Sequence, residues 1–173
     1  MNANLPVVLA VMQNMWVKDP VRVRSQIEKH GPEYRRRLIA MALFMGCVSG
    51  RRLQKAFGEE LCSRIVWDES TRQIEGDAKT IPPSDPEHVQ ALLAELKPAV
   101  VLTFGKVAYE RVAAFWKGKV IALPHPAARH ADVPARLLEG AARLRVLLAT
   151  IEFTRAQAAA NPAAELPIPE VAS

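Results

Sequence analysis

The chain has few of the features that mark secreted, membrane-spanning or metal-cluster proteins. Its two cysteines, Cys47 and Cys62, form no CxxC pair and have no histidine at metal-ligand spacing. We therefore expect reduced core thiols, with no disulfide, zinc site or iron–sulfur cluster. No apolar run approaches the ~20 residues that span a bilayer, and the first residues lack a basic patch and cleavage site typical of a signal peptide. These absences predict a cytoplasmic protein, nucleoid-associated if prokaryotic, with no cofactor, metal or membrane partner.

The length and composition bound the number of domains. Half of the 173 residues are hydrophobic, which is enough for one domain with a core and too little for two of ordinary size. We expect a single domain over residues 1–155 and a monomeric protein. Residues 156–173 are rich in alanine and proline without an aromatic residue, which predicts a flexible tail.

Positive charge is concentrated in one part of the chain. Residues 22–55 contain nine lysines and arginines against two glutamates, about +7, so the rest of the chain carries about −2 of the total of +5. Such a patch fits a polyanion, above all nucleic acid. A solvated helix face is the alternative reading.

Apolar runs and helical patterns alternate along the chain. We expect strands over residues 5–12, 64–67 and 99–104 and a fourth beginning at Val120, with a functional loop over residues 68–83. Helices are expected over residues 34–45, 50–57, 105–115 and 134–150, and a further one starts at residues 84–87. Ser49 is the expected N-cap of the helix over residues 50–57. The order predicts an α/β fold with a central four-stranded, mostly parallel sheet flanked by helices.

Two of the expected strands end abruptly at a polar side chain. The first, Val7 to Met12, is followed by Gln13 and Asn14, and the last is followed by Pro124 and His125. Since ligands of doubly wound sheets bind at the carboxyl ends of the strands, Asn14 and His125 are expected in one cleft.

Four blocks of sequence, spanning residues 7–148, resemble the uracil-DNA glycosylase superfamily, of which the chain would be a divergent member. They are Met12 to Trp16, Phe44 to Leu53, Pro98 to Ala108 and Leu123 to Arg129. The resemblance implies that Asn14 positions the attacking water and that His125 donates a hydrogen bond to the base carbonyl. It also implies base contacts and DNA contacts. The implied base-contacting residues are Gln13, Trp16, Phe44 as a stacking ring, and Asp68, and the implied DNA-contacting residues are Ser49, Arg51, Arg52 and Arg129.

The chain departs from the superfamily pattern at three places. In the loop that would press into the minor groove, Ala127 and Ala128 are small and only Arg129 is large enough to fill the space a base leaves. Met15 stands where a proline usually follows the water-positioning residue, and the stretch after the second strand has no asparagine to read the base. Asp68 or Glu69 would occupy that place, and an ionised carboxylate there would repel the O4 carbonyl of uracil. Phe44 also fits an ordinary core position in its apolar run.

Three functions fit these patterns. The first is a monofunctional, metal-free DNA glycosylase that hydrolyses the N-glycosidic bond of uracil or a related damaged or modified base in base excision repair. The second is a catalytically weak or inactive module of the same fold that binds DNA or a flipped base. The third is a small-molecule enzyme acting on a nucleotide or nucleoside, which the basic patch suits less well.

Overall fold

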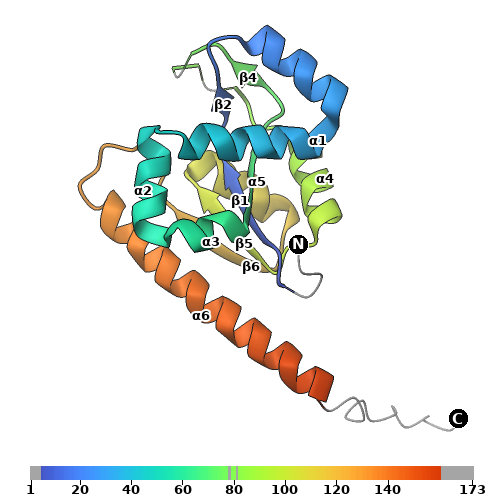
Figure 1. The fold of residues 1–173 in the computed structure, drawn as a ribbon, viewed down its shortest axis with the longest axis vertical. Coiled ribbons are helices and arrows are strands. Elements are labelled where there is room, and N and C mark those ends of the chain that lie inside the picture. The colour runs from blue at the N-terminus through green and yellow to red at the C-terminus, as the bar shows by residue number, and fades with distance from the viewer. Residues whose placement is uncertain (1–4, 78, 81, 161–173) are drawn as a thin grey trace, which may run out of the picture.

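A computed structural model describes residues 5–77, 79–80 and 82–160 of the chain (Figure 1). The strands are β1 (Val8–Met12), β2 (Met15–Trp16), β3 (Ile65–Glu69), β4 (Ile74–Glu75), β5 (Val100–Phe104) and β6 (Lys119–Leu123). The helices are α1 (Pro20–Phe44), α2 (Val48–Phe57), α3 (Glu59–Arg64), α4 (Pro86–Leu96), α5 (Lys106–Phe115) and α6 (Val133–Ala160). The four expected strands are present, and the structure adds two short strands, β2 and β4, and a short helix, α3, that the sequence did not predict.

The central sheet has four strands in the order β3-β1-β5-β6, and all of them run parallel. β1 and β5 are buried along their whole length, which explains why their sequences read as continuous apolar runs. The predicted α/β fold with a four-stranded parallel sheet is therefore confirmed. The carboxyl ends of all four strands lie at one edge, which we call the carboxyl edge.

Helices cover both faces of the sheet (Figure 1). On one face α4 and α5 pack against alternate residues of β1 and β5, including Leu9 and Val101. On the other face α1, α2, α3 and α6 pack against Ala10, Trp67 and Leu102. The alternation follows from the two-residue period of a strand, and it assigns each strand residue to one layer of the core.

α1 is longer than the sequence predicts, because it begins at Pro20 and not near Tyr34. The Asp19 side chain caps its first turn by accepting a hydrogen bond from the Arg22 N–H at 3.0 Å. Gly31, with φ of 81°, and Pro32 kink the helix into two halves. The first half is mostly polar, and a polar segment gives little helical periodicity to detect.

A second, two-stranded parallel sheet lies beyond the carboxyl ends of β1 and β3. β2 follows β1 and pairs with β4, which follows β3. The prediction of a loop over residues 68–83 is therefore wrong in two places. Asp68 and Glu69 complete β3, and Ile74 and Glu75 form β4. The main-chain N–H of Ser70 also donates to the Met12 carbonyl at 2.8 Å, which ties the two strand ends together.

The N-cap of α2 is Cys47, and not Ser49 as predicted. The Cys47 Sγ accepts a hydrogen bond from the Gly50 N–H at 3.2 Å, and Ser49 lies within the first turn. The helix ends at Gly58 with φ of 80°, as the glycine in the sequence predicts. At Gly50 the helix lies directly against the main chain at the end of α1.

We expect Gly50→Ala to destabilise the protein by about 3 kcal/mol or more. A Cβ atom at this buried position would overlap the carbonyl oxygen of Leu43, and main-chain atoms cannot rotate away. Urea unfolding measures the change in the free energy of unfolding. The matched control is Gly76→Ala, whose Cβ would lie at ordinary van der Waals distance from the Pro20 ring, 3.7 Å from Cγ and 4.0 Å from Cδ. Equal stability of the two variants would contradict the close approach of α1 and α2.

α6 continues through Ala160, beyond the residue at which the sequence predicts the tail to begin. Residues 161–173, the rest of the predicted tail, lie outside the described residues. None of the helices described is both long and apolar enough to cross a membrane.

Candidate active site at the carboxyl edge of the sheet

Three polar residues come from strand ends at the carboxyl edge. Asn14 follows β1 by two residues, Glu69 is the last residue of β3, and His125 follows β6 by two residues. β1 pairs directly with β3, and β5 lies between β1 and β6. Asn14 and Glu69 therefore come from neighbouring strands, while His125 lies further along the same edge.

The Asn14 segment is held by contacts of its main chain and side chain. Asn14 is half-buried, and its Nδ2 donates to the carbonyl oxygen of Thr80 at 3.5 Å. The carbonyl of Gln13 accepts a hydrogen bond from Ser70 Oγ at 2.7 Å. Gln13 is thus positioned through its main chain, next to Asn14. Nothing is described for the Trp16 side chain, so the predicted base contact of Trp16 lies outside the described residues.

His125 is half-buried in the turn that follows β6. Its Nδ1 accepts a hydrogen bond from the Ala127 N–H at 3.2 Å, and its carbonyl accepts one from the Ala128 N–H at 2.9 Å. Burial lowers the pKa of His125, which favours the neutral ring at physiological pH. A neutral ring that accepts at Nδ1 carries its proton on Nε2. The ring can therefore offer an Nε2–H donor to a ligand.

The loop that carries His125 is anchored by α2. Arg52 donates from Nη1 to the carbonyl oxygens of Pro126 and Ala128, at 2.7 and 2.8 Å. The sequence predicts a DNA contact for Arg52, whereas the structure gives this nitrogen a role in holding the loop. The contact also brings together the second and fourth sequence blocks, which lie far apart in the chain.

The other predicted DNA-contacting residues lie around this junction of α2 and the loop. Arg51 and Arg129 are exposed, and Ser49 is half-buried in the first turn of α2. Arg51 donates to the carbonyl of Gly46, just before the helix. An exposed guanidinium group is suited to contact phosphate.

Phe44 lies at the end of α1 on the Trp67 side of the sheet. Its half-buried ring meets Trp67 edge-on, with centroids 5.4 Å apart, and Trp67 stacks on Phe104 at 5.9 Å. Since Trp67 and Phe104 are buried, Phe44 is the member of this aromatic group that reaches towards the surface.

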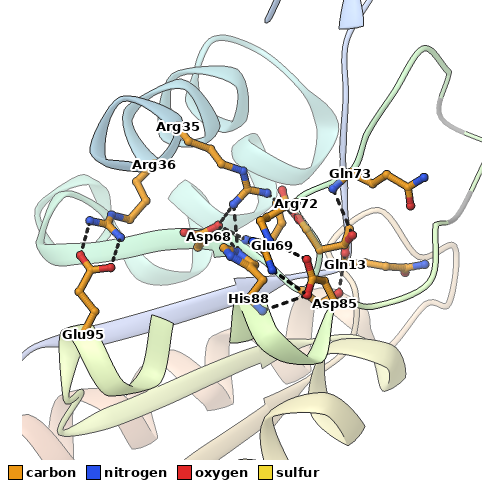
Figure 2. Close-up of polar contacts among 12 residues, drawn as sticks. Gln13, Arg35, Arg36, Asp68, Glu69, Arg72, Gln73, Asp85, His88 and Glu95 are labelled. Atoms are coloured by element: carbon orange, nitrogen blue, oxygen red, sulfur yellow. Dashed lines mark hydrogen bonds and ion pairs between the residues drawn. The ribbon is translucent and has the colours of Figure 1, made fainter. Parts of the chain in front are cut away.

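Asp68 is enclosed by a polar cluster that Figure 2 shows. Its Oδ1 accepts a hydrogen bond from Arg35 Nη1, lies 3.2 Å from His88 Nε2, and accepts the Glu69 N–H at 2.8 Å. Burial opposes ionisation, but the hydrogen bond from His88 and the charge of Arg35 outweigh it and lower the pKa of Asp68. Asp68 is 1% exposed. The predicted base contact of Asp68 is therefore occupied by internal partners.

Glu69 points to the opposite face of the sheet from Asp68. Trp67 packs with α1, α2 and α6, and Val66 packs with α4 and α5, so the alternation places Glu69 on the Trp67 side. Glu69 is 4% exposed, and its Oε2 has no hydrogen-bond partner among the described residues. Burial raises the pKa of Glu69 to about 8, against the opposing charge of Arg35 and with a further rise from Asp68.

Sequence reasoning missed Arg35 and His88. Arg35 donates from Nη2 to the Thr71 carbonyl at 2.6 Å and links α1 to β3 and α4, yet it stands in a run of three arginines that reads as solvent-exposed. The same cluster borders a pocket of about 360 Å³. The pocket is lined by Arg24, Ile27, Glu28, Gly31, Pro32, Arg35, Arg72, Ile74 and His88.

Comparison with known proteins does not assign the chain to a family. No family model matches the chain, and no curated protein matches it. Among the described residues, no group of three or more histidine, cysteine or acidic side chains could hold a metal ion.

Proposed function

We propose that the protein is a monomeric, monofunctional DNA glycosylase that hydrolyses the N-glycosidic bond of uracil or a related damaged or modified base. The observation that carries the proposal is the His125 ring, whose Nδ1 accepts the Ala127 N–H and whose Nε2 is thereby left as the donor, at the same sheet edge as Asn14. A donor that is fixed before the reaction is what a leaving base needs as negative charge develops on its carbonyl oxygen.

His125 would stabilise the departing base. Cleavage of the bond leaves an anionic base and a sugar with oxocarbenium character. A preorganised donor aimed at the developing oxyanion is typically worth roughly 3–4 kcal/mol. The N-terminus of α5 also lies at this place, since the position of a Cβ on Gly105 would be 3.6 Å from the His125 Cβ. Its helix dipole would favour the same negative charge.

Asn14 would position the attacking water. The Nδ2 group donates to Thr80, which leaves the Oδ1 atom to accept a hydrogen bond from water. An amide oxygen cannot take a full proton, but it can orient water while the sugar cation forms. The proton lost by the water is then released to solvent.

The basic surface would hold DNA while a base leaves the stack. Flipping a base costs a few kcal/mol, which phosphate contacts and stacking on an aromatic ring offset. Arg51 supplies exposed charge on α2, Arg129 supplies it on the loop that carries His125, and Phe44 supplies a ring on the Trp67 side of the sheet. DNA contact would thus draw on the end of α1, on α2 and on the His125 loop.

Alkali cleavage of abasic sites tests the proposal. Single- and double-stranded oligonucleotides that carry uracil, hypoxanthine, xanthine or hydroxymethyluracil are incubated with the protein and then treated with alkali. We expect strand cleavage with a uracil or modified-pyrimidine substrate. Absence of an abasic product from every substrate would reject the glycosylase.

The occupied Asp68 favours a second function, a module that binds DNA or a flipped base without cleaving it. Arg35 and His88 engage Asp68, and burial favours the protonated form of Glu69, so neither carboxyl is an ionised group free to activate water. Such a module would bind DNA with a strong salt dependence and yield no abasic product. Binding that is insensitive to salt would instead favour the small-molecule enzyme.

A further inference from the structure

Glu69 is a buried carboxyl group with an unsatisfied oxygen at the end of β3, where the proposed glycosylase would read the base. Glu69 is the last residue of β3 and pairs with Met12 of β1, two residues before Asn14. Its Oε2 has no hydrogen-bond partner among the described residues although the side chain is 4% exposed. Leaving a buried polar atom unpaired is costly, and such atoms are often completed by a ligand.

The charged groups around Glu69 come from three elements. Arg35 of α1 favours its ionised form, and Asp68, its neighbour in β3, disfavours that form. His88 of α4 lies against Asp68. Arg35 directs Nη1 and Nη2 to Asp68 and Thr71, while its Nε has no hydrogen-bond partner among the described residues. Among the same residues Glu69 forms no ion pair, although the charge of Arg35 acts on it.

We propose that Glu69 reads the base as a neutral carboxylic acid, using its O–H as a donor and its C=O as an acceptor towards an adjacent carbonyl and N–H of the base. The inference rests on the proposed glycosylase function and names its substrate class, a base with a neighbouring C=O and N–H. The O4 and N3–H of uracil are such a pair, and so are the O6 and N1–H of hypoxanthine. With uracil, His125 would then hold the O2 carbonyl, whereas hypoxanthine has no second carbonyl to offer it.

A neutral acid removes the conflict that the sequence raises. An ionised carboxylate at this position would repel the O4 carbonyl, because it offers acceptors only. The protonated group presents one donor and one acceptor, as the side chain of glutamine does. Its raised pKa of about 8 keeps this form dominant at neutral pH. Glu69, on the Trp67 side of the sheet, can therefore offer a donor and an acceptor to a base, whereas Asp68 is enclosed by its internal partners.

The pH dependence of uracil excision tests the inference. We expect kcat/KM of the wild-type protein to fall about tenfold per pH unit above about pH 8, as Glu69 ionises. Glu69→Gln keeps a donor and an acceptor at every pH, so its activity should stay level over the same range. Glu60→Gln, a change at an exposed glutamate of α3, is the matched control and should follow the wild-type profile.

The outcomes separate this inference from the proposed function. Excision by the wild-type protein with the same pH profile as Glu69→Gln would overturn the role of Glu69 and leave the glycosylase standing. An inactive Glu69→Gln that folds and binds DNA as the wild type does would also overturn it. No excision by any variant at any pH would reject the glycosylase itself.

Protein stability gives a readout that needs no activity. A carboxyl with a raised pKa holds its proton in the folded state and loses it on unfolding between pH 4.5 and about 8. The folded state then binds more protons, so stability falls as pH rises through this window and levels off above it. The urea midpoint of Glu69→Gln relative to wild type should therefore rise from pH 5 to 8. A constant difference would overturn the neutral acid.

Discussion

Replacing His125 with alanine should lower the rate of uracil excision about 100-fold or more, with DNA binding largely intact. The variant removes the Nε2–H donor that would stabilise the anionic base, while the loop keeps its anchor from Arg52 to Pro126 and Ala128. Single-turnover rates measure the chemical step, and fluorescence anisotropy with a labelled oligonucleotide measures binding. Asn14→Ala should cause a loss of similar size, because the water loses its acceptor.

His130→Ala is the matched control for this prediction. His130 lies in the same loop but is exposed, so its removal should change the rate little. Unchanged rates in both His125→Ala and Asn14→Ala would show that the site lies elsewhere. A parallel loss of rate and DNA binding in His125→Ala would assign the residue to the DNA surface and not to the chemistry.

Asp68→Asn should cause a large loss of stability. The substitution leaves the buried guanidinium of Arg35 without its carboxylate, and breaking a buried ion pair from one side typically costs about 3–5 kcal/mol. Urea unfolding measures the free energy. Glu95→Gln is the matched control, because it breaks the half-exposed pair with Arg36 and should cost at most about 1 kcal/mol.

Acid adds a second measurement for Asp68. Its pKa is lowered in the folded protein, so its ionisation contributes stability above the unfolded value of 3.8. That contribution is lost as pH falls through the folded pKa, since the unfolded state then binds more protons. Wild type should therefore lose more stability below about pH 4 than Asp68→Asn does.

The neutral-pH comparison decides whether the cluster is buried. Equal losses of unfolding free energy in Asp68→Asn and Glu95→Gln would contradict the buried ion pair.

Much of the scaffold could be predicted from the sequence because its signals are local. β5 is a continuous apolar run since both of its faces are covered, and α4 begins where Asp85 can cap it and Pro86 can fill its first turn. The two strand ends at Asn14 and His125 were visible for the same reason. Each apolar run stops at a polar side chain, and parallel strands bring those stops to one edge.

The parts that the sequence did not show depend on contacts between distant segments. The first half of α1 is polar and packs near the small β2–β4 sheet. No local sequence pattern predicts this packing. Arg35 reads as one of several surface arginines until Asp68 and Thr71 are seen around it. Whether Asp68 or Glu69 would read a base depends on which face of the sheet each side chain points to. Neighbouring residues of a strand point to opposite faces, and the sequence alone does not say which residue points to which face.

Titrating free uracil into protein with ¹⁵N-labelled histidine tests the central claim most directly. The chain has four histidines, and His88 borders the pocket near the α1 kink while His125 lies at the carboxyl edge. We expect a shift of the His125 Nε2 resonance, with the neutral tautomer of His125 unchanged and with the resonances of His30 and His130 unmoved. A titration that leaves His125 unmoved, whether or not His88 responds, would contradict a base-binding site at the carboxyl edge.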